Sequence, residues 1–279
     1  MGFRKTLLYR GYKIAKKLGF VSLINSVFNR ASILIYHRVN NQEQARLSIS
    51  TALFEEMVEN MAKKYNIISL ESLIERLNEK KEIPNRAVVI TFDDGYRDNY
   101  LYGARILKKY NLTATFFVTS GYIGSDRNFP WDTEVEEKRS IMDWDEVREL
   151  SRMGFEIGGH TVNHVDLGKV SLGVAEKEIR ECKDKIEDEI GQEINKFAYP
   201  FGGKDAIRPE VIEIIKNTGY ICCCSGYGGK VRSGGDPFRL HRISMYRNLT
   251  DLLMELDNFH TYFNGRMKFG PWNENNAKG

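Results

Sequence analysis

Short apolar runs alternate with longer amphipathic segments along most of the chain. The apolar runs are rich in β-branched and aromatic residues and predict strands at residues 31–37, 65–70, 87–94, 113–120, 155–161, 196–202, 220–226 and 238–245. The amphipathic segments repeat apolar positions every three or four residues and predict helices at residues 52–65, 96–110, 143–153, 174–190 and 210–217. Because strands and helices take turns, we expect an α/β fold with a closed or nearly closed (β/α) barrel of about eight parallel strands.

The first 30 residues follow a different pattern, which predicts a basic amphipathic helix. Apolar residues recur at helical spacing at Ile14, Leu18, Val21, Ile24 and Phe28. Basic residues that precede the first acidic residue, Glu43, include Arg4, Lys5, Arg10, Lys13, Lys16, Lys17 and Arg30. The commoner arrangement would pack the apolar stripe across the barrel floor. The alternative is peripheral contact with an anionic membrane surface or a membrane-bound partner.

The rest of the chain is expected to form one domain. No repeat of fixed period and no low-complexity linker divides it. We therefore assign residues 31–265 to the barrel, with its core motifs between residues 85 and 250, and residues 266–279 to a flexible tail. The longest irregular segment, residues 124–140, is a candidate substrate-facing loop.

Composition and charge exclude some functions. The chain has 279 residues, 42% of them hydrophobic, and a net charge of +3. Basic residues mostly alternate with acidic ones, so we expect no nucleic-acid partner. No apolar stretch reaches the ~18 residues of a membrane span, and no secretory signal is evident. Neighbouring cysteines on one strand, at 222–224, do not suit disulfide geometry, and with Cys182 they are expected to be reduced thiols. These features favour a cytoplasmic protein that is either free or membrane-associated.

Reactive or turn-forming residues follow five of the predicted strands. They are His37, the pair Asp93 and Asp94, His160, the segment YPFGG at 199–203, and His241. In parallel barrels, catalytic groups gather on the loops at the carboxyl ends of the strands. The pattern therefore places a candidate active site at one end of the barrel.

The segment AVVITFDDGYRDN at 87–99 ends a buried strand on two adjacent carboxylates. Buried acids are costly unless a charged partner neutralises them, which suggests a cation. Gly95 would let the backbone turn so that Asp93 and Asp94 both face one mouth. An ordinary turn is the alternative interpretation of these three residues.

A pair of histidines follows the strand at 155–161. His160 and His164 are four residues apart, which would put both imidazoles on one face of a helical turn. A surface pair would have the same spacing. Together with one carboxylate of the acid pair, two imidazoles form a ligand set suited to zinc, iron, cobalt or nickel.

Several segments resemble the polysaccharide deacetylases, which share the NodB homology domain. TFDDG at 91–95 and HTVNH at 160–164 are similar to the first two motifs of that family, and FAYPFGG at 197–203 is similar to the third. The segment 144–161 resembles the approach to the histidine pair, and the whole resemblance covers residues 31–250. It implies a distorted (β/α) barrel of seven or eight strands and a hydrolase that removes N-acetyl groups from N-acetylhexosamine units of a glycan or glycoconjugate.

The resemblance also implies a role for each motif residue. Asp93 would be the general base, and Asp94, His160 and His164 would hold a divalent metal, with zinc expected first and cobalt, nickel or iron as alternatives. After Pro200, the backbone N–H of Phe201 would bind the oxyanion. The aromatic side chains that are candidates for lining a sugar groove are Tyr36, Trp131, Tyr199 and Phe201, with Trp131 and Phe201 favoured.

Two further roles have more than one candidate. His37, in ILIYHRV, resembles the general acid of the circularly permuted branch of the family, and His241 resembles the histidine that serves in many other members. We favour His37. The family often has an arginine at the start of the third motif, where this chain has Ala198. Arg242 or Arg239 is the expected substitute that would lower the pKa of the Asp93 carboxyl.

Two other classes of function remain as alternatives. One is a carbohydrate-binding protein without catalytic activity, and the intact Asp93, Asp94, His160 and His164 argue against it. The other is a glycoside hydrolase that uses two carboxylates, in which the histidine pair would have no task. Release of acetate distinguishes the deacetylase from the glycoside hydrolase, and activity that is lost on chelation and restored by a divalent metal would reject the binding protein.

Overall fold

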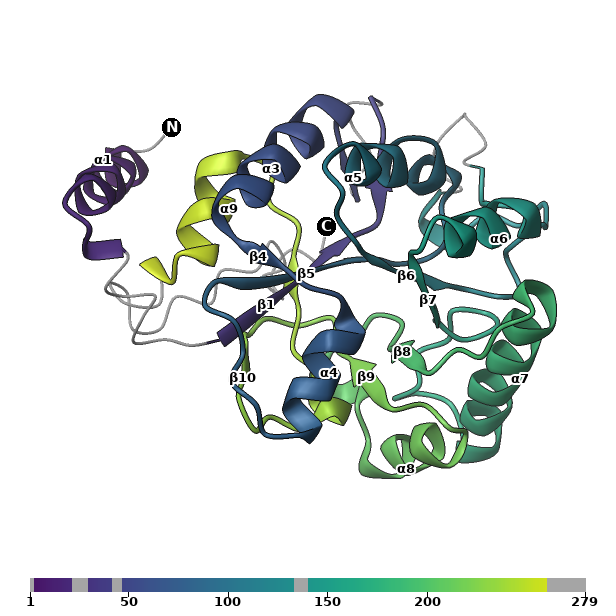
Figure 1. Cartoon of the computed structure of the whole chain (residues 1–279). Coiled ribbons are helices and arrows are strands. Elements are labelled where there is room, and N and C mark those ends of the chain that lie inside the picture. Colours follow the sequence, from purple (N-terminus) through teal and green to yellow (C-terminus); the bar gives the residue numbers. More distant parts are fainter. Residues whose placement is uncertain (1–2, 22–29, 42–46, 133–139, 260–279) are drawn as a thin grey trace.

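A curled sheet of mostly parallel strands forms the centre of the molecule (Figure 1). The computed structural model describes residues 3–21, 30–41, 47–132 and 140–259. The order along the sheet is β10-β1-β5-β6-β7-β8-β9, with β11 beside β1 and β4 beside β5, and β2 pairs with β3 apart from it. The strands are β1 Arg30–Tyr36, β2 Arg38–Val39, β3 Ser48–Ile49, β4 Asn66–Ile67, β5 Ala87–Phe92, β6 Thr115–Val118, β7 Glu156–Gly159, β8 Lys196–Ala198, β9 Cys222–Cys224, β10 Val231–Arg232 and β11 Ile243–Ser244.

Helices surround the sheet in Figure 1. They are α1 Phe3–Lys17, α3 Thr51–Lys64, α4 Leu70–Asn78, α5 Arg105–Lys109, α6 Trp144–Arg152, α7 Leu172–Ile190, α8 Pro209–Asn217 and α9 Leu249–Leu256. Serine side chains begin α3, α4 and α7, where Ser50, Ser69 and Ser171 each accept a hydrogen bond from a backbone N–H of the first turn. Such caps satisfy N–H groups that have no partner inside the helix.

The segment 240–244 brings the two edges of the sheet together. Leu240 forms a parallel bridge with Cys224 of β9, and Ile243 pairs with Leu34 of β1. The backbone N–H of Ser225 also donates to the carbonyl of Leu240 at 2.8 Å. The sheet therefore curls into a nearly closed barrel, as the sequence predicts, and the carboxyl ends of its parallel strands surround one mouth.

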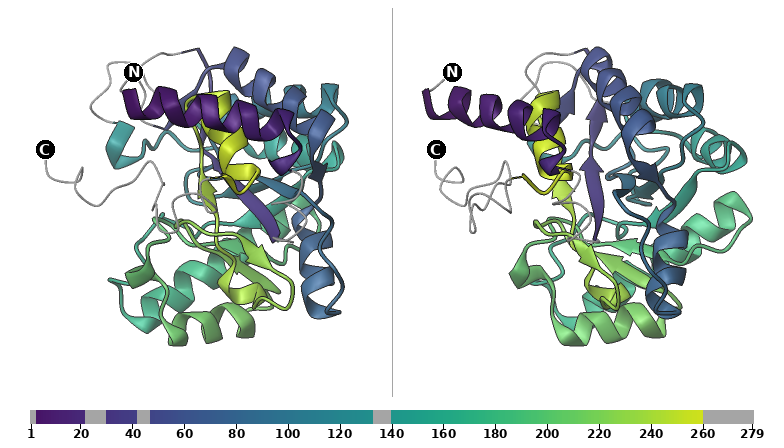
Figure 2. Two further views of the ribbon diagram at one scale, coloured as in Figure 1. Left: turned by 90° about the vertical axis from the view of Figure 1, so that its left-hand side faces the viewer. Right: turned by 60° about the vertical axis from the view of Figure 1, so that its left-hand side comes forward.

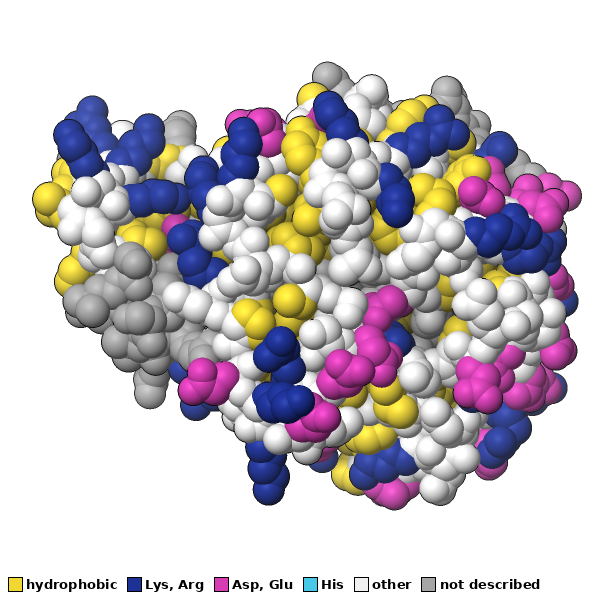
Figure 3. All heavy atoms as spheres, in the orientation of Figure 1, with side chains coloured by type: hydrophobic (Ala, Val, Ile, Leu, Met, Phe, Trp, Pro, Cys, Tyr) yellow, Lys and Arg dark blue, Asp and Glu magenta, His cyan; other side chains and the backbone are white. Residues whose placement is uncertain are grey.

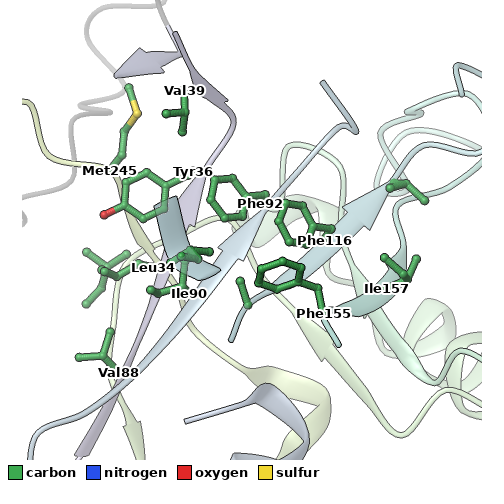
Figure 4. Close-up of a cluster of buried hydrophobic side chains, with 14 of the residues drawn as sticks. Leu34, Tyr36, Val39, Val88, Ile90, Phe92, Phe116, Phe155, Ile157 and Met245 are labelled. Atoms are coloured by element: carbon green, nitrogen blue, oxygen red, sulfur yellow. The ribbon is translucent and has the colours of Figure 1, made fainter. Parts of the chain in front are cut away.

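Alternating side chains of the strands belong to two different clusters of the core. Residues such as Leu34, Ile90 and Phe92 join the larger cluster with the covering helices, and the rings of Phe92 and Phe116 stack 4.7 Å apart (Figure 4). The intervening residues, including Ile33 and Val89, join a second cluster that links opposite sides of the curled sheet. Both faces of the strands are thus buried, which explains why their sequences read as continuous apolar runs.

Some elements differ from the prediction. The predicted strand at 65–70 is confirmed only as β4, because Ser69 caps α4, which was not predicted. Helix α9 was also missed. The predicted helix at 96–110 is a π-helix over Asn99–Ala104 that continues as α5. The strand expected at 238–245 shortens to β11 because Pro237–Arg239 form a 3₁₀ turn.

Helix α1 lies alongside α9 in both views of Figure 2 and is fixed there by tyrosines. The hydroxyl of Tyr9 donates to Asp251 at 2.7 Å, and that of Tyr12 donates to Asp257 at 2.5 Å. The ring of Tyr12 also packs edge-on against Phe259, 5.2 Å away. A tyrosine face therefore attaches α1 to the barrel.

The apolar stripe predicted for this helix does not pack on the barrel floor. Ile14 and Leu18 are 60% and 77% exposed, while Val21 is buried. Ile24 and Phe28 lie outside the described residues, as does the tail at 266–279. The prediction of a packed stripe is therefore wrong for Ile14 and Leu18, because the tyrosines provide the packed face instead.

All four cysteines are free and buried, as predicted. Cys222 and Cys224 face the second cluster, whereas Cys223 between them faces the first. This alternation is what a strand requires. Among the described residues, none of the helices combines the length and the apolar character needed to cross a bilayer.

Candidate active site

The acid pair directly follows strand β5 and lies at the mouth of the barrel. The backbone N–H of Asp93 still donates to the Tyr36 carbonyl at 2.9 Å, which keeps Asp93 in line with β1. Asp94 then adopts a φ of +79°, followed by Gly95 at +92°. Left-handed backbone is uncommon outside glycine and often marks a functional site. The chain thus turns at Asp94 itself as well as at the predicted Gly95.

An irregular loop after β7 carries the two histidines. Thr161 and His164 have φ values of +61° and +54°, so the helical turn expected over 160–164 is wrong. Helix α7 holds the loop, because Glu178 accepts from the backbone N–H of Asn163 at 2.8 Å and from its side-chain amide at 2.6 Å. The loop places the ring centroids of His160 and His164 4.9 Å apart.

Asp94, His160 and His164 converge on one point. Nε2 of His160 and Nε2 of His164 lie 3.5 and 3.2 Å from Oδ1 of Asp94, and one ligand atom from each residue lies within 4.8 Å of the others. Nδ1 of His160 lies 2.8 Å from the carbonyl oxygen of Ala198, to which it donates in the tautomer that leaves Nε2 unprotonated. The atoms of the three side chains that could bind a metal therefore lie close together.

This donor set fits a divalent cation. Asp94 is 1% exposed, and neither of its carboxylate oxygens has a hydrogen-bond partner among the described residues. Burial favours the neutral acid, yet the nearby imidazoles of His160 and His164 hold the pKa of Asp94 well below its usual range. Metal ligands must be deprotonated. Two imidazoles and one carboxylate suit zinc, and the same set is compatible with cobalt, nickel or iron.

Arg242 holds the other carboxylate of the pair, that of Asp93, in a two-point contact. Its Nη1 and Nη2 atoms each lie 2.8 Å from one oxygen of Asp93, and Nε donates to the Ser225 carbonyl at 2.6 Å. Burial favours the neutral acid, but Arg242 and His160 hold the pKa of Asp93 below its ordinary value. The guanidinium expected from outside the third motif is therefore that of Arg242, whereas Arg239 pairs with Asp236 at the surface.

Replacing Arg242 with alanine is expected to raise the pKa of Asp93, since the guanidinium is the close opposite charge that lowers it. If Asp93 acts as a base, the acid limb of the rate–pH profile will move to higher pH with it. Arg242→Lys should shift it less, because a lysine keeps the charge but cannot form both hydrogen bonds. The measurement is kcat/KM for acetate release against pH. Arg239→Ala is the matched control, and an equal shift there would contradict the clamp.

The structure separates the two candidate histidines for proton donation. His37 directly follows β1, which pairs with β5. Burial lowers the pKa of His37, and the nearby carboxylates of Asp94 and Asp93 act in the opposite direction. His241 instead lines a cavity of about 80 Å³ with Tyr199 and packs against Tyr227. The geometry therefore favours His37.

The YPFGG segment forms a tight turn beside the histidines. Phe201 has a φ of +60°, and the N–H of Gly202 donates to the Pro200 carbonyl at 2.6 Å. A Cβ on Gly202 would lie 2.0 Å from the backbone nitrogen of Gly226, so only glycine fits there. None of the hydrogen bonds found in the described part of the chain uses the N–H of Phe201. That group is available to bind an oxyanion.

A stack of rings supports one wall of the site. Trp131 lies face to face with Phe129 at 4.9 Å, and its edge contacts His164 at 5.0 Å. Its indole N–H donates to the Tyr96 hydroxyl at 2.9 Å, which in turn donates to Asp132 at 2.5 Å. The sequence analysis selected Trp131 but missed these supports. The aromatic residues of NFPWD at 128–132 could have indicated the stacking partner Phe129, but nothing in the sequence indicates Tyr96.

Trp131→Ala is expected to raise KM for an oligomeric glycan about 3- to 10-fold, because one aromatic contact is worth about 0.5–1.5 kcal/mol. kcat should change less. The KM of Trp131→Phe should lie between that of the unaltered chain and that of Trp131→Ala, since phenylalanine keeps a ring but loses the hydrogen bond to Tyr96. Initial-rate kinetics check this. Trp144→Phe, on α6, is the control, and a KM that stays unchanged in Trp131→Ala would remove Trp131 from the substrate site.

The other aromatic candidates lie in different surroundings. Phe201 is 59% exposed, and its ring lies 4.8 Å from that of His164. Tyr199 and Tyr36 are both 1% exposed. Tyr36 packs on Phe54 and Phe92 in the core. In this structure, therefore, Phe201 and Trp131 contact His164 of the candidate metal site, whereas the buried rings of Tyr36 and Tyr199 present no face to a glycan.

The chain is similar to known proteins over most of its length. The family model described as polysaccharide deacetylase matches residues 80–222. The chain is 26% identical over 253 residues to the poly-β-1,6-N-acetyl-D-glucosamine N-deacetylase of Staphylococcus epidermidis, covering 83% of this chain and 84% of that protein. The resemblance of His37 to the circularly permuted branch stays a prediction, because the family match begins at residue 80.

Two solved structures share the fold. The deacetylase PplD of Streptococcus pyogenes, in complex with acetate, superposes with a TM-score of 0.69 at 25% identity and covers 81% of this chain and 97% of its own. IcaB from Ammonifex degensii gives a TM-score of 0.72 at 21% identity, with 82% and 97% covered. The nearly closed barrel seen here is thus an established architecture.

Proposed function

Since the chain belongs to the polysaccharide deacetylase family, we propose that it is a metal-dependent hydrolase that removes N-acetyl groups from N-acetylhexosamine units of a glycan. A polymer of β-1,6-linked N-acetylglucosamine is the first candidate substrate, since a relative that is similar over most of both chains is named for it. The observation that carries the proposal is the convergence of Asp94, His160 and His164 beside Asp93, which Arg242 clamps.

The two adjacent acids have different roles: Asp94 would be a metal ligand and Asp93 the general base. Asp94, His160 and His164 would hold the cation, which supplies Lewis-acid polarisation and makes water more acidic when it is bound. Asp93 takes the proton of the attacking water, and its low pKa keeps it ionised and ready to do so. Arg242 fixes the carboxylate in one orientation through two hydrogen bonds.

The remaining groups serve the later part of the reaction. The N–H of Phe201 donates to the oxyanion that forms when water adds to the acetamide carbon. His37 then protonates the nitrogen as the C–N bond breaks, which releases acetate and a free amine. Because burial lowers the pKa of His37, its imidazole starts neutral and first takes up a proton from solvent, which the negative charge that develops beside it favours.

The test is an assay of acetate release on N-acetylglucosamine and N-acetylgalactosamine oligomers, with β-1,6- and β-1,4-linkages compared and zinc or cobalt added. The proposal expects acetate, oligomers of unchanged length and more free amine. Shorter oligomers without acetate would indicate a glycoside hydrolase instead. Affinity for the oligomers with neither product would indicate a carbohydrate-binding protein, and either result would overturn the proposal.

A further inference from the structure

Helix α1 has two opposite faces, and among the described residues only one of them contacts the barrel. Tyr9 and Tyr12 attach one face to α9. At 3.6 residues per turn, Leu7, Ile14 and Leu18 fall within about 40° of one another on the opposite side. They are 62%, 60% and 77% exposed, which makes them the most exposed large apolar side chains of the described residues.

A buried cluster of polar groups fixes the orientation of α1. Asp257 is 0% exposed and accepts hydrogen bonds from Tyr12 at 2.5 Å, from Tyr65 at 2.7 Å and from Arg86 at 2.7 Å. Lys16 adds an ion pair at 3.4 Å. A rotation of α1 that buried Leu7, Ile14 and Leu18 would break the contacts of Tyr12 and Lys16 and leave the buried carboxylate of Asp257 with fewer partners, which is costly. The apolar stripe is thus held facing outward.

The outward face combines an apolar groove with positive charge. A groove of about 590 Å³ runs along the stripe, with Phe20 and Phe259 also in its wall. Arg10, Lys13 and Lys17 are exposed on one flank of the same helix. Figure 3 shows basic side chains gathered over α1 with hydrophobic ones at its outer edge. No acidic residue precedes Glu43 to offset them.

We propose that this face of α1 docks on the surface of an anionic lipid bilayer. An apolar stripe flanked by lysine and arginine is the pattern of helices that lie in the membrane interface, where apolar side chains enter the acyl boundary and basic ones meet acidic headgroups. The proposed contact is peripheral, with α1 lying in the membrane interface. It does not depend on the proposed activity.

A second copy of the chain fits this face less well. A symmetric contact would bring Arg10, Lys13 and Lys17 of both copies together, and like charges in an interface repel. A stripe of three large side chains is also much smaller than the roughly 800 Å² per partner of a stable interface. A bilayer has neither problem, because its acidic headgroups complement the flank.

The experiment is co-sedimentation of the full chain with vesicles of phosphatidylcholine alone and with about 30% phosphatidylglycerol, at low and high salt. We expect at least ~10-fold stronger binding to the anionic vesicles, weakening as salt screens the charges. Leu7→Ser/Ile14→Ser/Leu18→Ser and, separately, Arg10→Glu/Lys17→Glu should each reduce that binding about 10-fold or more. The matched control is Val174→Ser/Lys177→Glu on the exposed face of α7, which should bind as the unaltered chain does.

Each other outcome counts against the proposal. Equal binding to neutral and anionic vesicles, no binding, or full binding by both α1 variants would overturn it. A dimer in sedimentation velocity that the triple serine variant dissolves would assign the face to a second copy instead. If the serine variant melts at a lower temperature, the Arg10→Glu/Lys17→Glu variant decides, because its side chains are exposed. Acetate release from a soluble oligomer should be the same in all variants, so failure here is distinct from failure of the proposed activity.

Discussion

Asp93→Asn is expected to lower kcat for acetate release by about 10²–10⁴-fold, the usual contribution of a general base. The amide has nearly the shape of the carboxylate and can still accept one hydrogen bond from Arg242, but it cannot take a proton from water. Metal content should stay at the level of the unaltered chain, because Asp93 is not among the three converging ligands. Steady-state kinetics with metal analysis of the same sample check both points.

Asp257→Asn is the matched control for Asp93→Asn. Asp257 is also a buried aspartate that pairs with an arginine, Arg86, but it lies at the attachment of α1. This change should lower the free energy of unfolding by about 3–5 kcal/mol, because it leaves buried donors poorly paired. It should leave kcat within about twofold. If both variants lost activity equally, the effect would be general destabilisation, and Asp93 would lose its role as the base.

Removal of the metal by a chelator should reduce acetate release to background, and zinc or cobalt should restore it. The chain should also become less stable. If the free metal concentration had been about 100 times the Kd, the loss is about 2.7 kcal/mol of unfolding free energy. The physical reason is the buried Asp94, whose oxygens have no hydrogen-bond donor in the described structure and would face two imidazoles without a cation.

Thermal melting with and without chelator measures this stability difference, and His164→Ala is the control for it. In that variant the chelator should change the melting temperature little, because the ligand set is already incomplete. Full activity after exhaustive chelation, with no metal detected in the sample, would contradict the metal-dependent mechanism.

The sequence was informative where chemistry is concentrated in short segments. Asp93 and Asp94 come directly after a strand, and His160 follows another, so the parallel topology alone brings them to one mouth. Ala198 stands where the family often has an arginine, and a buried carboxylate needs a cationic partner. The sequence therefore indicated Arg242 or Arg239 as the substitute. Contacts between Arg242 and Asp93, 149 residues apart in the chain, then follow from the closure of the barrel by segment 240–244.

Other features depend on contacts that spacing does not encode. The spacing of four positions from His160 to His164 suggested a helical turn, yet Glu178 of α7 holds them in an irregular loop. The support of Trp131 by Tyr96 needs two loops that are 35 residues apart. Periodicity correctly found a helix near the N-terminus, but the packed face was decided by the hydroxyls of Tyr9 and Tyr12 rather than by Ile14 and Leu18.

The most direct test of the account is the number of zinc ions that the purified chain binds after equilibrium dialysis, measured by elemental analysis. We expect one zinc per chain in the unaltered protein and in Asp93→Asn. His160→Ala and His164→Ala should each retain far less than one. Zinc bound at full stoichiometry in both histidine variants, or none bound by the unaltered chain, would show that Asp94, His160 and His164 do not form a metal site.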